Sequence, residues 1–234
     1  VAVSTNALEL SGFDAGEVSI YFYDHYVGGL GIAEKIYAEG TKRGFHVLDA
    51  PVTGGDTGAK AGTLSILVGG DKEDFEACMP LFEAMGTNIN YQGEAGKGQH
   101  CKLANQIMIA GTLSGVCEAL TYAKEQGLDL DVVMRSVSTG AAGSKQLDTF
   151  GPKIIAGDYA PGFFMKHFIK DMKLALIEAN RKGLSLDVLS MVLANYEELE
   201  AEGYGELGTQ ALIRFYDEEH RYMEDEEEPE QAEE

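Results

Sequence analysis

The sequence predicts an α/β region joined by a long helix to an all-α region. Three short runs with the residue preferences of β-strands all lie before residue 96. After that point the strand signals stop, and apolar residues recur at helical spacing. The long helix starts near Gly96 and is expected to end near Gln126, just before Gly127. We therefore expect two domains, over residues 1–95 and 96–222, with the long helix at their junction.

The first region alternates between helix and strand signals. A helix is expected first, over residues 32–40, followed by strands over 45–48, 64–68 and 88–91 with a turn at 49–52. Between the last two strands, apolar residues at helical spacing predict one helix, capped by Asp71 and ended by Gly86. Residues 53–63 contain too many glycines for a helix, so we expect a loop there.

The second region is expected to contain shorter helices after the long one. Their predicted ranges are 131–136, 166–181, 188–201 and 210–216. Residues 224–234 are almost entirely Glu, Asp, Pro and Gln, which cannot bury enough apolar surface to become ordered. We therefore expect a disordered acidic tail over residues 223–234.

Composition limits the classes of function. The chain has 234 residues, 44% of them hydrophobic, which is enough for a substantial core. Its net charge of −21, without a basic cluster, argues against nucleic acids and anionic membranes as partners. No charge-free run long enough to span a bilayer and no secretory leader is evident, so neither the membrane nor secretion is expected.

The cysteines favour a reducing compartment. There are three, Cys78, Cys101 and Cys117, without disulfide or zinc-ligand spacing, and each lies in an apolar, helix-like context. Cys101 follows His100, but neighbouring helical residues point in different directions and no further ligands recur at a suitable spacing. We expect a cytoplasmic protein without a metal ion.

The best candidate for a chemical centre is the run of residues 96–106. Glycines lead directly into an apolar helix that carries Lys102, Asn105 and Gln106. Lys102 is one helical turn from each of the two amides, so an amine and two amides share one face. The alternative is a solvated surface lysine, which is the commoner situation. The apolar residues around it favour a buried helix, where a lysine requires a reason.

Two further segments have chemical potential. The glycine-rich residues 53–63 can present backbone N–H groups to a carboxylate or phosphate, although an ordinary surface loop explains the composition equally well. Lys170 and Asp171 lie on a predicted helix introduced by Phe163 and Phe164. A Lys-Asp pair on a helix usually faces solvent, but the two aromatic residues and the apolar neighbours are also compatible with a buried, functional pair. By contrast, the GxG at Gly29 lacks the third glycine of a dinucleotide-binding turn, and we interpret it as a helix-opening loop.

Together these segments resemble the β-hydroxyacid dehydrogenase family, which includes 3-hydroxyisobutyrate dehydrogenase and tartronate semialdehyde reductase. The resemblance covers residues 32–217, in the family's order. Four segments carry it, at residues 49–55, 96–106, 143–148 with Gly143, Ser144, Leu147 and Asp148, and 170–171.

The resemblance implies hydride transfer between NAD or NADP and a small 3-hydroxy acid or its semialdehyde, without a metal. Lys102 would be the general acid/base, for which burial and a neighbouring cation both favour the required neutral amine. The substrate would be bound by Thr53, Gly54, Gly55, Asn105 and Gln106. The cofactor side would contain Lys170, Asp171 and Phe163. Thr53 replaces the family's usual serine, and its additional methyl group would favour a smaller substrate. A homo-oligomer assembled through the helical domain is also implied.

Two segments that are usual in the family have no match in this sequence. The family begins with a strand and a GxGxxG turn that holds the pyrophosphate, and neither matches residues 1–30. We therefore expect an incomplete Rossmann-like domain. The serine or threonine pair that usually precedes the helix at 32–40 is also replaced, by residues 26–29. Two alternatives to the enzyme stay open, a non-catalytic truncated homologue acting as an interaction protein and a metabolite-binding protein without redox chemistry.

Overall fold

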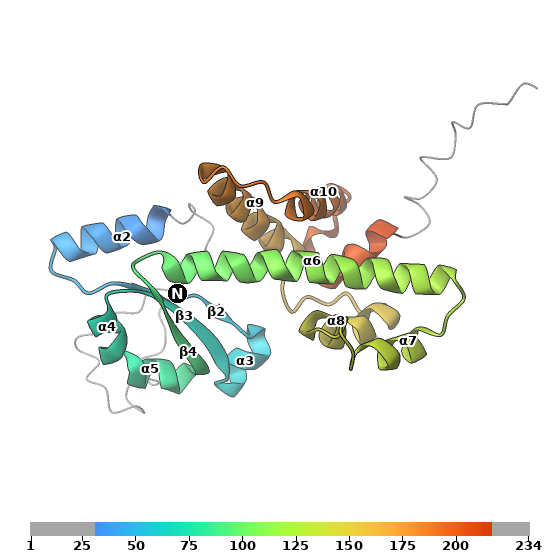
Figure 1. Cartoon of the computed structure of the whole chain (residues 1–234), viewed down its shortest axis with the longest axis horizontal. Coiled ribbons are helices and arrows are strands. Elements are labelled where there is room, and N and C mark those ends of the chain that lie inside the picture. The colour runs from blue at the N-terminus through green and yellow to red at the C-terminus, as the bar shows by residue number, and fades with distance from the viewer. Residues whose placement is uncertain (1–30, 217–234) are drawn as a thin grey trace, which may run out of the picture. The chain divides into compact units, whose positions relative to one another are not determined.

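The structure is a computed structural model that describes residues 31–216 (Figure 1). The expected tail at 223–234 and the glycine at position 29 lie outside the described residues. The chain forms two compact units, Val1–Asn105 and Gln106–Glu234. The α/β elements belong to the first unit and the helical elements to the second, so the predicted fold class is confirmed. One helix, α6 (Lys97–Glu125), runs from the first unit into the second.

Among the described residues, a four-stranded sheet organises the first unit. Its central strand β3 (Leu64–Gly70) pairs in parallel with β4 (Gly86–Gly93). Two short strands, β1 (Leu48–Asp49) and β2 (Val52–Thr53), pair with β3 in the antiparallel direction. The predicted turn at 49–52 is therefore wrong, because residues on both sides of Pro51 join the sheet. The carbonyl oxygen of Pro51 still accepts from the N–H of Leu67, although proline itself cannot donate.

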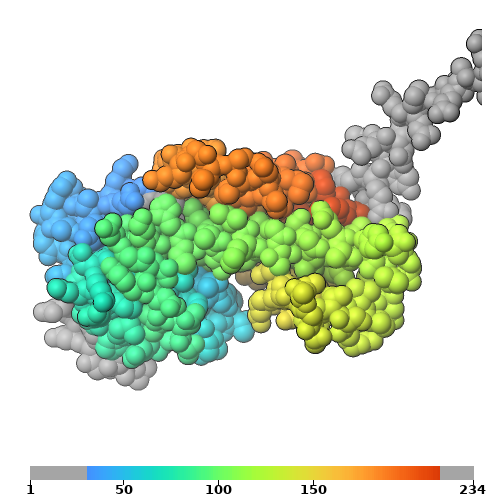
Figure 2. Space-filling model, in the orientation of Figure 1, coloured from blue at the N-terminus to red at the C-terminus, as the bar shows by residue number. Residues whose placement is uncertain are grey.

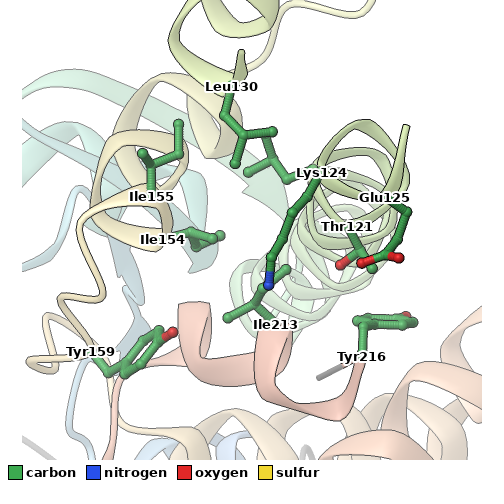
Figure 3. Close-up of a pocket in the computed structure, with 10 residues that line it drawn as sticks. Thr121, Lys124, Glu125, Leu130, Ile154, Ile155, Tyr159, Ile213 and Tyr216 are labelled. Atoms are coloured by element: carbon green, nitrogen blue, oxygen red, sulfur yellow. The ribbon is translucent and has the colours of Figure 1, made fainter. Parts of the chain in front are cut away.

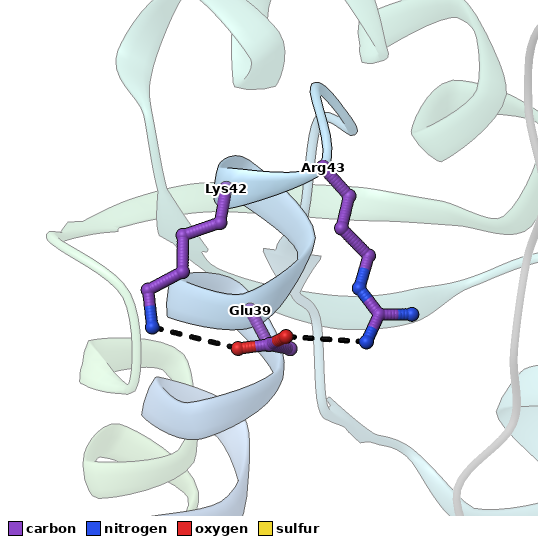
Figure 4. A network of polar contacts seen from close by, with 3 residues as sticks. All are labelled: Glu39, Lys42 and Arg43. Carbon is purple, nitrogen blue, oxygen red and sulfur yellow. Dashed lines mark hydrogen bonds and ion pairs between the residues drawn. The ribbon is translucent and has the colours of Figure 1, made fainter.

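Four short helices complete the described part of the first unit. They are α2 (Gly31–Lys42), α3 (Gly55–Ala61), α4 (Lys72–Ala77) and α5 (Met79–Met85). At the end of α2, Glu39 pairs with Lys42 and Arg43 at 3.5 and 3.1 Å (Figure 4). These side chains are exposed, so the ion pairs contribute little to stability.

Two predictions for these helices are wrong. Residues 55–61 form the helix α3 rather than a loop. The positive φ angles lie at its two ends, at Gly54 before the helix, at Gly55, its first residue, and at Gly62, which ends it, so they do not interrupt the helix. The helix predicted after Asp71 is divided at Cys78, and the Asp71 side chain caps no N–H. Asp71 instead accepts a hydrogen bond of 2.9 Å from the hydroxyl of Tyr37.

The second unit consists of helices around an apolar core. Besides most of α6, it contains α7 (Leu130–Val137), α8 (Lys145–Ile155), α9 (Met165–Arg181) and α10 (Asp187–Ala201). Two 3₁₀ helices follow, η2 (Tyr204–Glu206) and η3 (Thr209–Tyr216). The last predicted helix is thus 3₁₀ rather than α, and α8 was not predicted. The helices α9 and α10 pack against each other and are coloured orange in Figure 2.

Buried aromatic and aliphatic side chains hold the second unit together. Phe168 of α9 meets Tyr196 of α10 edge to face, with ring centroids 5.4 Å apart. The Tyr196 hydroxyl donates to the carbonyl oxygen of Thr209 at 2.8 Å, so this buried polar group is satisfied. Burial raises the pKa of Tyr196 and of the Cys117 thiol, which therefore behaves as a small apolar group. By length and composition α6 alone among the described helices resembles a membrane span, but buried core helices share these properties.

Candidate active site

The start of α6 is fixed by close packing. Gly96 has a φ of 86°, a conformation that favours glycine, and the N–H of His100 donates to its carbonyl oxygen at 3.0 Å. At Gly98, a Cβ atom would overlap the carbonyl oxygen of Leu67 in β3. The two glycines therefore allow the helix to begin in close contact with the sheet.

The three polar residues predicted on α6 are held at different depths. The helix is continuous through them, so Lys102 lies one turn before both Asn105 and Gln106, as the sequence predicts. Lys102 and Asn105 are half-buried, whereas Gln106 is buried with an exposed fraction of 3%. Lys102 and Asn105 belong to the first unit and Gln106 to the second.

Asp171 brings two predicted site residues together within the second unit. Its Oδ2 accepts from Nε2 of Gln106 at 2.8 Å, and its Oδ1 lies 3.2 Å from Nζ of Lys170. Asp171 is buried, and the Lys170 side chain is about a quarter exposed. Both carboxylate oxygens thus have partners inside the protein. Asp171 thus orients an amide and an ammonium group, and its place on the cofactor side stays a prediction.

The other predicted residues lie at element boundaries. Thr53 ends β2 and is half-buried, whereas Gly54 and Gly55 are exposed with φ angles of 131° and 61°. Phe163 precedes α9 and is 37% exposed. Its ring meets that of Phe168 edge to face at 6.0 Å, so this exposed ring is anchored in the second unit.

An open cavity of about 440 Å³ lies at the carboxyl ends of the parallel strands in the first unit. Asp71 directly follows β3, and Glu94 and Ala95 directly follow β4. Glu34 and Tyr37 of α2 complete the lining. In open α/β sheets, ligands bind outside the carboxyl ends of the strands. This cavity was not predicted, because acidic residues after two strands meet only once the strands are known to be parallel neighbours.

The charge of this cavity limits what it can bind. Three of its lining residues carry carboxylates, and the hydrogen bond to Asp71 raises the pKa of Tyr37. Carboxylates accept hydrogen bonds from hydroxyl groups and repel phosphates. The cavity therefore suits a polyhydroxyl group such as a ribose.

A second cavity, of about 200 Å³, lies in the helical unit (Figure 3). Aliphatic side chains from several helices line it, together with Lys124, Tyr159 and Tyr216. It contains no predicted site residue. Among residues 31–216, no group of three or more His, Cys, Asp or Glu side chains is arranged to hold a metal ion.

Fold and site together define an α/β protein with a ligand cavity at the strand ends and a half-buried lysine on the helix that follows. Two family descriptions match it. NAD-binding of NADP-dependent 3-hydroxyisobutyrate dehydrogenase matches residues 96–216, and the NAD binding domain of 6-phosphogluconate dehydrogenase matches residues 29–93. The chain belongs to the β-hydroxyacid dehydrogenase family, as the sequence motifs predicted.

Individual proteins agree with this assignment. An uncharacterized oxidoreductase of Bacillus subtilis is 47% identical over 196 residues, covering 84% of this chain and 68% of that protein. The 2-hydroxy-3-oxopropionate reductase of Escherichia coli is 41% identical, covering 71% of this chain and 57% of the reductase. The crystal structure of 3-hydroxyisobutyrate dehydrogenase from Salmonella typhimurium matches with a TM-score of 0.74 at 26% identity, covering 80% of this chain and 66% of that one. The chain thus spans between 57% and 68% of the length of these proteins.

The family supports NAD or NADP as the cofactor. The described residues fit part of such a molecule. Within the first unit, Glu34, Asp71 and Glu94 offer acceptors for ribose hydroxyls. The turn that would receive the pyrophosphate is not among the described residues.

Proposed function

We propose that this chain catalyses hydride transfer between NAD or NADP and a small 3-hydroxy acid, resembling 3-hydroxyisobutyrate or the glycerate and tartronate semialdehyde pair. The observation that carries the proposal is the half-buried Lys102 on an apolar helix that follows a parallel strand. The names of the Escherichia coli and Salmonella typhimurium relatives support this class of substrate. Family membership favours an enzyme over the non-catalytic and metabolite-binding alternatives.

Lys102 is the proposed general acid/base. In the oxidative direction, the neutral Nζ of Lys102 accepts the hydroxyl proton while the carbon–oxygen bond becomes a carbonyl. The bound nicotinamide supplies the hydride acceptor. In the reductive direction the Lys102 ammonium returns the proton to the oxygen. The substrate is oxidised or reduced by two electrons, and no further reactant is needed.

The remaining residues bind and orient the substrate. The Thr53 hydroxyl and the backbone N–H groups of Gly54 and Gly55 would donate to its carboxylate, since both glycines are exposed and have no side chain of their own. Asn105 and Gln106 would contact its other polar groups. The hydrogen bond to Asp171 limits the Gln106 amide to one orientation before the substrate arrives.

A turnover assay tests this function. The full chain is incubated with NAD⁺ or NADP⁺ and either 3-hydroxyisobutyrate or glycerate, and in the reverse direction with tartronate semialdehyde and the reduced cofactor. We expect measurable nicotinamide reduction or oxidation with at least one pair. Binding of neither cofactor below about 1 mM, measured calorimetrically, would favour the non-catalytic alternative. A hydroxy acid that raises the Tm without any cofactor, together with no turnover, would favour metabolite binding.

We also propose a cytoplasmic homo-oligomer. The three cysteines are free thiols, consistent with a reducing compartment. Exposed apolar residues on or next to α9 and α10 suit assembly through the helical unit, namely Ile177, Leu184, Val188 and Met191. Light scattering coupled to size-exclusion chromatography measures the oligomeric state, and a monomer at micromolar concentration would contradict this proposal.

A further inference from the structure

The Asp49 side chain holds the start of α6. Its Oδ1 accepts from the N–H of Gly96 at 2.7 Å, and its Oδ2 accepts from the N–H of Gln99 at 2.9 Å. The first turn of α6 contains no acidic residue of its own, so Asp49, from β1, supplies the negative charge that a helix N-terminus favours. Hydrogen bonds to a charged acceptor are also stronger than neutral ones.

The space around this carboxylate is closely fitted. A Cβ atom at Gly69 of β3 would lie 2.6 Å from Oδ1, and one at Gly98 of α6 would lie 2.7 Å from Oδ2. Both distances are too short for a real side chain. The carboxylate therefore occupies a slot that exists because glycine stands on each side of it.

Asp49 also belongs to the segment that carries the predicted substrate loop. Its own strand β1 pairs with β3 at Gly69, and β2, which ends in Thr53, pairs with β3 at Ser65. In the helix whose first turn Asp49 contacts, Gly98 and Gln99 lie one turn before Lys102. A single side chain thus connects the two parts of the proposed site that lie in the first unit.

We propose that Asp49 is a positioning residue for the proton transfer, one that fixes Lys102 relative to Thr53, Gly54 and Gly55 at the junction of β2 and α3. The inference rests on the proposed function. A displacement of about 1 Å between reacting groups costs about a hundredfold in rate, whereas ground-state binding tolerates more movement. Loss of the hydrogen bonds from Gly96 and Gln99 to Asp49 is therefore expected to lower kcat more than it raises KM.

Asp49→Asn tests this role with little change in shape. An asparagine has one acceptor oxygen, so its NH₂ group must face one of the two N–H donors. We expect kcat to fall about tenfold or more with KM changed about threefold or less. Amide exchange at Gly96 and Gln99, followed by NMR, is expected to accelerate about fivefold or more.

Asp129→Ala is the matched control. Asp129 caps α7 by accepting from the N–H of Val132 at 3.1 Å, and it lies among no predicted site residues. Its loss should lower stability and accelerate exchange in α7 while leaving kcat unchanged. If the loss of any helix cap lowered activity, kcat of Asp129→Ala would fall as well.

Two results would overturn the inference. One is a kcat of Asp49→Asn that equals the wild-type value after correction for the folded fraction. The other is unchanged exchange at Gly96 and Gln99. If the wild-type chain has no turnover, the proposed function fails by itself, and the exchange measurement still decides whether Asp49 holds the helix.

Discussion

At the residue scale, Lys102 is the side chain on which the proposed chemistry depends. We expect Lys102→Ala to lower kcat about a hundredfold or more, because the variant lacks the group proposed to move the hydroxyl proton. The Tm should change little, since the side chain is only half-buried. Steady-state kinetics and a thermal scan measure both effects.

Lys124→Ala provides the comparison for this variant. Lys124 is an exposed lysine on the same helix, near its other end. Its removal changes the net charge by the same amount and should leave kcat at the wild-type value. Equal kcat values for the two variants would exclude Lys102 as the general acid/base.

Asp171 is expected to contribute to the stability of the fold, which can be measured separately from activity. Asp171→Ala removes one hydrogen-bond acceptor of the buried Gln106 amide and the carboxylate that pairs with Lys170. We expect the free energy of unfolding to fall by about 2 to 4 kcal/mol in urea denaturation. In Glu197→Ala, loss of the exposed pair with Lys173 should cost about 0.5 kcal/mol or less. Equal losses in the two variants would contradict the structural role of Asp171.

The sequence could identify residue types at this scale but could not predict their partners. The amine and amides on α6 follow from helical spacing alone, so their common face could be predicted. The contact between Gln106 and Asp171 joins residues far apart in the chain, and no local pattern encodes it. Asp49 escaped prediction for the same reason, because it caps a helix that begins long after it in sequence.

At the element scale, we expect alanine to have opposite effects on stability at two glycines of α6. Gly98→Ala would place a methyl group against the Leu67 carbonyl and the Asp49 carboxylate, and we expect a loss of about 2 kcal/mol or more. Gly115→Ala meets no atom within 4 Å and should stabilise the helix by about 0.5 to 1 kcal/mol. Chemical denaturation of both variants measures the difference. Stabilisation by Gly98→Ala would show that α6 does not pack closely against β3.

Helices with several turns of apolar spacing could be predicted well from the sequence, whereas the glycine-containing helices α3 and α8 could not. The helices α6, α9 and α10 were predicted to within a few residues, because each carries several turns of apolar spacing. The glycine content of residues 55–61 predicts a loop, yet packing beside β3 stabilises the two turns of α3. Helix α8 contains Pro152 and Gly151, which hid its pattern.

At the scale of the whole molecule, the net charge of −21 opposes the proposed ligands. Hydroxy acids and nicotinamide dinucleotides are anions, so they approach against a negative field. At about 0.01 M ionic strength this repulsion extends about 30 Å, whereas at about 0.15 M it is screened within about 8 Å. The acidic cavity lined by Glu34, Asp71 and Glu94 adds to the repulsion of the dinucleotide cofactor.

We therefore expect kcat/KM for the hydroxy acid to rise severalfold as ionic strength increases over this range, with little change in kcat. Salt would act on the approach of the ligand, and the bound complex would be unaffected. Initial rates at a series of sodium chloride concentrations, at constant pH and saturating cofactor, measure the dependence. A fall in kcat/KM would mean that the local positive charge of Lys170 outweighs the net charge. In that case Lys170→Gln should reverse the direction of the salt effect, which would identify this lysine as the group that attracts the substrate.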